Sequence, residues 1–145
     1  MNEHSQKITL SIDSRLESVC LVGWAVRGIC SYLSLPEDNV FCVELAVCEA
    51  VNNAIEHAYG NEPEHTIEVH IQLDAHQLRI QIMDSGQGFD PSPHREISTV
   101  HRPDNCLCPP DRGRGLAIIS SVMDAWSLTR THHGVNILTM TKLFT

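Results

Sequence analysis

Three segments of the chain, 7–12, 66–73 and 78–82, alternate apolar and polar residues with the period of two that is typical of a half-buried β-strand. Two further strands are predicted at 125–131 and 135–143. The four residues between the second and third segments have the length of a hairpin connection. Strands with one apolar and one polar face indicate a mixed, mostly antiparallel sheet of about five strands, covered by helices on one face only.

Three other segments, 16–33, 37–59 and 116–123, repeat apolar residues with the period of an α-helix. A serine followed three residues later by a glutamate is the capping-box pattern, which places the starts of the first two helices at Ser14 and Ser34. The second segment is followed by a glycine, where a left-handed residue commonly ends a helix. Together these elements predict an α+β fold, a two-layer α/β sandwich with three main helices.

The second predicted helix has an unusual polar face. Glu49, Asn53 and Glu56 fall within one narrow arc at about 100° per residue, with Asn52 and His57 at its edges. This face has no lysine or arginine, whereas an ordinary solvated face mixes both signs of charge. Carboxylate and amide oxygens suit Mg²⁺, which proteins usually share with the phosphates of a substrate. The alternative is a polar helix face without a task.

A glycine-containing turn follows the strand predicted at 78–82. Asp84 stands at the strand end, and Gly86 and Gly88 complete a D-x-G-x-G pattern in which the backbone can approach a ligand closely. Such compositions are common in turns, so an ordinary surface turn is the alternative. Residues 90–112 come next, with little periodicity and most of the prolines, and a loop of this length between glycine-rich turns is expected to be a lid.

A second glycine-rich sequence, Arg112-Gly113-Arg114-Gly115, closes the expected lid and leads into the third predicted helix. Free backbone N–H groups and the helix dipole attract phosphate at such a position. Arg112 and Arg114 would add charge-assisted hydrogen bonds to a terminal phosphate. Solvated loop arginines are the alternative.

Composition narrows the class of protein. The 145 residues fit a single domain over 1–145, and the formal net charge of −8 without a basic cluster argues against direct nucleic-acid binding. The first residues lack the pattern of a signal peptide, and no stretch has the ~20 apolar residues of a bilayer span, so we expect a cytoplasmic protein without membrane contact. The six cysteines are expected to be reduced, and Cys106 and Cys108 have no second pair at metal-site spacing.

The order of these features is more specific than any one of them. An acid-amide helix, a D-x-G-x-G turn, a long loop and a G-x-G helix start resemble the N, G1 and G2 boxes of the GHKL ATPase superfamily, with its Bergerat ATP-binding fold. No G-x-x-x-x-G-K-[ST] loop is present, so P-loop phosphate binding is excluded. Within the superfamily, the segment CEAVNNAIEHAYG looks most like the anti-sigma factor serine kinases of bacterial partner-switching systems.

This resemblance implies roles for individual residues. Asn53 would coordinate the Mg²⁺ that bridges the phosphates of ATP, and Glu49 would act as the general base that accepts the proton of a partner serine. Asp84 would accept a hydrogen bond from the adenine amino group. Gly86 and Gly88 would shape the base pocket. Gly113 and Gly115 would let backbone N–H groups reach the phosphates.

The resemblance also implies partners. The protein would be an ATP-dependent protein serine kinase and an anti-sigma factor, which sequesters a sigma factor and phosphorylates an anti-anti-sigma protein of the STAS type. A homodimer is expected from the resemblance alone. In one departure from the family, Val135 and Asn136 follow the glycine that opens the last strand, where many relatives have threonine beside the adenine. Asn136 and Thr139 are the two candidate substitutes.

Two other functions stay open from the sequence. One is an ATP-gated regulatory binding module that has no kinase activity and acts on a partner other than a sigma factor. The other is the detached catalytic domain of a histidine kinase. That form requires a dimerisation helix with a phosphoacceptor histidine, and the only histidine before Glu44 is His4, which lies outside any helical pattern.

Overall fold

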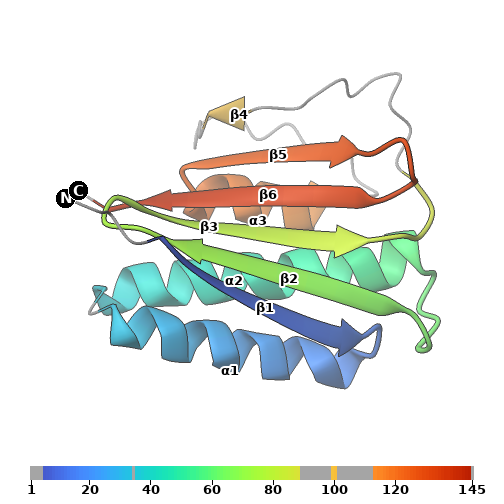
Figure 1. Ribbon diagram of the computed structural model, residues 1–145, viewed down its shortest axis with the longest axis horizontal. Helices are drawn as coiled ribbons and strands as arrows, with labels where there is room; N and C mark the ends of the chain where they lie inside the picture. The colour runs from blue at the N-terminus through green and yellow to red at the C-terminus, as the bar shows by residue number, and fades with distance from the viewer. Residues whose placement is uncertain (1–4, 34, 89–98, 101–112, 145) are drawn as a thin grey trace.

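A six-stranded sheet and a layer of helices on one of its faces make up the fold (Figure 1). The computed structural model describes residues 5–33, 35–88, 99–100 and 113–144. Every described strand pair is antiparallel, in the order β1-β2-β3-β6-β5-β4. The strands are β1 (Gln6–Asp13), β2 (Thr66–Leu73), β3 (Gln77–Asp84), β4 (Thr99–Val100), β5 (Ala125–Arg130) and β6 (Asn136–Leu143).

The predicted fold class is confirmed, with two differences in the sheet. The five predicted strands are present with their ends shifted by a few residues, and the two-residue β4 is additional. The prediction allowed a mixed sheet, but no parallel pair occurs among the described strands. The residues between β4 and its neighbours fall in the predicted lid, 90–112, which lies outside the described residues apart from β4 itself.

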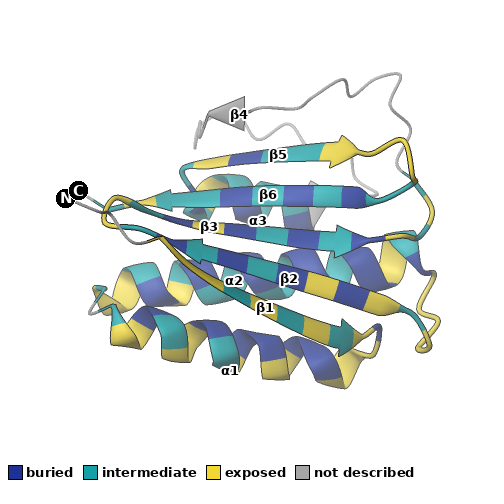
Figure 2. Cartoon of the chain, in the orientation of Figure 1, coloured by how far each residue is buried: buried dark blue, intermediate teal, exposed yellow. Residues whose placement is uncertain are grey.

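The helices are α1 (Leu16–Tyr32), α2 (Glu37–Asn53) and α3 (Gly113–Val122), and a short π-helical turn, η1 (Ala54–Ala58), continues α2. Buried residues alternate with more exposed ones along β2 and β3, and the apolar residues of the alternating strand pattern are the buried ones (Figure 2). In β2 and β3 these are Ile67, Val69, Ile71, Leu73, Leu78, Ile80 and Ile82, all at most 4% exposed. Burial of this apolar surface is the main force that joins the two layers.

The first two helices begin at Leu16 and Glu37, where the apolar periodicity placed them, but their caps differ from the prediction. Arg15 and Pro36 are the N-cap residues of α1 and α2, and neither cap has a side-chain hydrogen bond. The capping boxes expected at Ser14 and Ser34 are therefore wrong, and Ser34 itself lies outside the described residues. At the end of the second helix, Gly60 has the predicted left-handed conformation, with φ of 58°.

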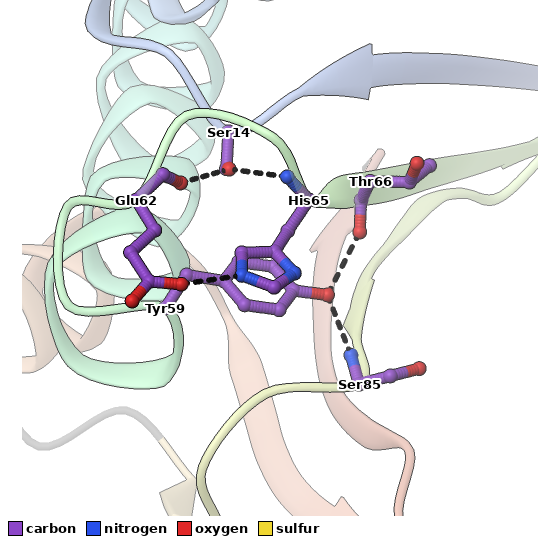
Figure 3. Close-up of polar contacts among 6 residues, drawn as sticks. All are labelled: Ser14, Tyr59, Glu62, His65, Thr66 and Ser85. Carbon is purple, nitrogen blue, oxygen red and sulfur yellow. Dashed lines mark hydrogen bonds and ion pairs between the residues drawn. The ribbon is translucent and has the colours of Figure 1, made fainter.

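The Ser14 hydroxyl makes other hydrogen bonds, which explains why it does not cap α1. Its side chain is 1% exposed; its hydroxyl donates a hydrogen bond to the Glu62 carbonyl and accepts one from the His65 backbone N–H at 3.1 Å (Figure 3). The His65 ring stacks on Tyr59, with 4.3 Å between centroids, and contacts the Glu62 carboxylate at 2.8 Å. Ser14 therefore ties the connection between η1 and β2 to the start of α1.

Two further predictions concern membrane-spanning segments and the cysteines. Within them, no helix is long and apolar enough to cross a membrane. Cys20, Cys30, Cys42 and Cys48 are free thiols, and burial raises the pKa of Cys30 to about 11, with a smaller contribution from the charge of Glu44. Cys106 and Cys108 lie outside the described residues.

The tie at Ser14 leads to a stability prediction. Ser14→Ala removes both hydrogen bonds of a buried hydroxyl, one to the Glu62 carbonyl and one from the His65 N–H, so the free energy of unfolding should fall by about 1–3 kcal/mol. Ser11→Ala, which removes a hydroxyl from an exposed position of β1, is the matched control and should change stability by about 0.5 kcal/mol or less. Chemical denaturation measures both variants, and equal stabilities would contradict the role of Ser14.

Candidate functional site

A cavity lies between the helix layer and the sheet, where β3 and β5 end and β6 begins. Its volume is about 100 Å³ and it is open to solvent on one side. It is lined from the helices by Ala50, Asn53, Ala54, His57, Ala58 and Leu116, and from the sheet and its turns by Ile82, Asp84, Gln87, Gly88, Leu128, Asn136 and Leu138. The walls are mostly apolar with a few polar groups, which is the usual make-up of a small-molecule site.

Strand alternation brings Asp84 into this cavity. The side chains of β3 that face the helices are every second residue from Leu78 to Ile82, and Asp84 continues that series at the strand end. The carboxylate is 8% exposed, and its Oδ1 accepts hydrogen bonds from Asn136 Nδ2 at 2.7 Å and from the Gly86 N–H at 3.0 Å. Desolvation raises the pKa of Asp84 above its usual value, opposed by these two hydrogen bonds and by the charge of Arg130.

The turn after Asp84 is fixed to the end of the helix layer. The Gln87 N–H donates to the Ala58 carbonyl at 2.7 Å. The Ser85 N–H donates to the Tyr59 hydroxyl at 2.8 Å, and that hydroxyl donates to the Thr66 carbonyl at 2.9 Å (Figure 3). A Cβ on Gly86 would lie 2.3 Å from the Ala58 carbonyl oxygen, so only glycine fits there.

The π-helical turn η1 makes this attachment possible. Its backbone hydrogen bond from the Tyr59 N–H to the Ala54 carbonyl, 3.1 Å long, spans five residues instead of the four of an α-helix. Ala58 lies at the end of this turn, and its carbonyl accepts the hydrogen bond from Gln87. The helix that was predicted to run unbroken to residue 59 therefore changes its winding where it meets the glycine turn.

The start of α3 meets the acid-amide face of α2. A Cβ on Gly115 would lie 2.6 Å from Asn53 Nδ2, so the absence of a side chain at Gly115 is what lets α3 approach Asn53. Gly113 and Arg114 form the first residues of α3, and Arg112 lies outside the described residues. The free N–H groups of this helix start therefore lie beside the amide that lines the cavity.

The other residues of the acid-amide face are placed differently. Glu49 precedes Asn53 by one helical turn and is half-buried, but it is not among the residues that line the cavity. Glu56 and His57 are both exposed, and of the two His57 lines the cavity. No group of three histidine, cysteine, aspartate or glutamate side chains within the described ranges is arranged to hold a metal ion.

The structure distinguishes the two candidates on the last strand. Asn136 is 5% exposed, lines the cavity and contacts Asp84, its register partner across β3 and β6. Thr139 belongs to the alternate set of β6 and accepts a hydrogen bond from Gln81 on the outer face of the sheet at 3.2 Å. The Thr139 side chain therefore lies on the face of the sheet away from the cavity. Thr139 as the substitute for the family's threonine was wrong.

Sequence reasoning missed Arg130 and Tyr59. Arg130 Nη1 donates to Asn136 Oδ1 at 2.7 Å, and it follows Trp126 and Leu128 on the inward face of β5. The period-two alternation of β5 places Arg130 on the inward face of the strand. It points to the site only once the register is known, because the register pairs Arg130 with Asn136. Tyr59 was only the last residue of the predicted helix 37–59, and nothing in the sequence indicates that its hydroxyl binds the glycine turn.

Comparisons with known proteins identify the family of this chain. The family model of the histidine kinase-like ATPase domain matches residues 12–142. A serine-protein kinase RsbW of Bacillus thuringiensis is 28% identical over 127 residues, which are 86% of this chain and 78% of the relative. A serine-protein kinase RsbW of Listeria innocua is 31% identical over 121 residues, 81% of this chain and 76% of the relative.

A solved structure shares the fold. The crystal structure of the RsbU and RsbW domains of a Mycobacterium tuberculosis protein superposes with a TM-score of 0.67 at 18% sequence identity. The match covers 95% of this chain but only 32% of that longer chain. Family model, relatives and fold agree, and the chain therefore belongs to the histidine kinase-like (GHKL) ATPase family, among relatives of the RsbW serine-protein kinases.

Proposed function

We propose that this chain binds ATP with Mg²⁺ in the cavity described above and transfers the γ-phosphoryl group to a serine of a partner protein. The observation that carries the proposal is the convergence of three sequence motifs on one cavity. Asn53, Asp84 and Gly88 line it together, and Gly115 packs against Asn53. The mostly apolar walls with one buried carboxylate fit an aminopurine, since the carboxylate accepts a hydrogen bond from an amino group.

Each residue has a role in this proposal. Asp84 holds the base, and Asn53 supplies an oxygen to the metal. The N–H groups at the start of α3 bind phosphate oxygens, with Arg112 and Arg114 as additional donors. When bound, ATP would supply the phosphoryl group and Mg²⁺ would offset the charge of the phosphates, so the residues of this chain contribute mainly positioning and electrostatics. Glu49 accepts the proton of the partner's serine hydroxyl.

The partners follow from the relatives' names together with the implied family roles. We propose an anti-anti-sigma protein of the STAS type as the substrate and a sigma factor as the sequestered protein. Large apolar side chains are exposed on α1 and α2, including Trp24 at 66% and Phe41 at 63%, and such groups are typical of a surface that a partner or a second copy covers. A cytoplasmic location and a homodimer belong to the same proposal.

The assignment of Glu49 is tested by Glu49→Gln, which preserves shape and removes the proton acceptor. Transfer of ³²P from γ-labelled ATP to a STAS-type partner should fall by about 10²–10⁴-fold, while ATP affinity stays near that of the unaltered protein. Glu37→Gln, at the exposed start of the same helix, is the control and should transfer normally. Full transfer by Glu49→Gln would show that another group is the base.

The metal role of Asn53 is tested by calorimetry. Asn53→Ala should weaken ATP binding in the presence of Mg²⁺ by about tenfold or more, because it removes a ligand of the metal. Without Mg²⁺, the affinities of the variant and the unaltered protein should be similar. Asn39→Ala, in the first turn of α2, is the matched control. An unchanged Mg²⁺ dependence in Asn53→Ala would contradict the metal role.

The partner proposal is tested by pull-down with the tagged protein in the presence of ATP or of ADP. A sigma factor and a STAS-type protein should be captured, with a balance that depends on the nucleotide. If the protein binds ATP and captures a regulator but never phosphorylates it, the ATP-gated binding module is the correct function. If neither class of protein is captured with either nucleotide, the partner-switching role is wrong.

A further inference from the structure

The strongest unexplained feature is a row of three polar side chains across the sheet at the edge of the cavity. Asn136 is the register partner of Asp84 on one side and of Arg130 on the other. All three lie on the inward face, each in the alternate series that elsewhere contributes apolar side chains to the core. Arg130 is the only member that does not line the cavity.

Hydrogen bonds connect the row in one direction. Arg130 Nη1 donates to Asn136 Oδ1 at 2.7 Å, and Asn136 Nδ2 donates to Asp84 Oδ1 at 2.7 Å. The amide nitrogen of Asn136 also lies 3.3 Å from the Gln87 carbonyl oxygen. If the Asn136 amide turned over, its oxygen would face a carboxylate and a carbonyl, and its nitrogen would face a cation. Arg130 therefore fixes which end of the amide meets Asp84.

The guanidinium is itself held in place. Arg130 Nη1 lies 3.4 Å from the Gly86 carbonyl, so it contacts the glycine turn as well as Asn136. A Cβ on Gly88 would lie 2.6 Å from Nη1, and a Cβ on Gly134 would lie 3.3 Å from Nη2. Gly88 was assigned to the base pocket, but the structure shows that it also leaves room for Arg130.

The hydrogen bonds of this row determine which oxygen of Asp84 is available to a ligand. Both hydrogen bonds that the described residues donate to its carboxylate end on Oδ1, which leaves the second oxygen as an acceptor for a donor in the cavity. An ionised carboxylate can only accept, so it matches an amino group at C6 of a purine and opposes a carbonyl there. A site with such a buried group discriminates strongly against analogues that leave the group unpaired.

We propose that Arg130 is a positioning residue for base recognition, which orients Asn136 so that Asp84 is held as the acceptor for the 6-amino group of adenine. This inference rests on the proposed binding of ATP and adds the determinant of base preference. Arg130 acts through Asn136 and does not touch the base.

The test compares two nucleotides that differ only in this amino group, ATP and purine riboside triphosphate. The unaltered protein should bind ATP about tenfold more tightly, as expected for a hydrogen bond to a charged group. Arg130→Met should weaken ATP binding by about five- to tenfold and binding of the analogue by about twofold or less, so that the preference is largely lost. Calorimetry gives both affinities.

Four further variants make the result specific. Arg79→Met removes the same group from the exposed face of β3 and should keep the preference. Arg130→Lys retains a cationic donor and should keep more of it than Arg130→Met. In the double variant with Asn136→Leu, the loss should be no larger than for Asn136→Leu alone, because both residues act through one contact.

The outcomes separate this inference from the proposed function. If the unaltered protein prefers ATP and Arg130→Met keeps that preference, or loses affinity for both nucleotides equally, the positioning role of Arg130 is wrong while ATP binding stands. If the unaltered protein binds neither nucleotide, the proposed function itself is wrong, and the inference falls with it.

Discussion

The contact between the end of the second helix and the turn after β3 is the constraint on which the site depends. The Ala58 carbonyl accepts the Gln87 N–H, and Gly86 packs so close to that carbonyl that no side chain would fit. The contact joins the helix that carries Asn53 to the strand that carries Asp84. The hydrogen bond from the Ser85 N–H to the Tyr59 hydroxyl supports the same attachment, and the two bonds together fix the orientation of the turn, which apolar packing alone defines less well.

Much of the fold could be predicted from periodicity, because its strands have one buried and one exposed face. Period-two alternation identified the buried residues of β2 and β3, and the helical repeats identified α1 and α2. Periodicity does not report where polar backbone groups find their partners. The π-helical turn at Ala54–Ala58 and the use of Ser14 by the loop at Glu62 and His65 depend on such partners, so both were missed.

The site was predictable to a similar degree and for a similar reason. Asn53, Asp84 and Gly88 are recognisable because each combines a residue type with a position in a predicted element, and the structure brings them to one cavity. The chemical roles assigned to them, and to Glu49, remain predictions. The choice of Asn136 over Thr139 required knowing which face of β6 each residue occupies, and a strand with apolar residues on both faces gives little indication of that.

The row from Arg130 to Asp84 shows why a buried carboxylate is tolerated at the edge of an apolar core. Burial alone would favour the protonated acid, which would donate a hydrogen bond, whereas the proposed contact with adenine requires an acceptor. Two hydrogen bonds donated to Oδ1 and a nearby cation oppose that effect, and neither hydrogen bond occupies the second carboxylate oxygen. The inward faces of three strands thus change from apolar to polar at one end, and this change gives the cavity beside the core a hydrogen-bonding edge.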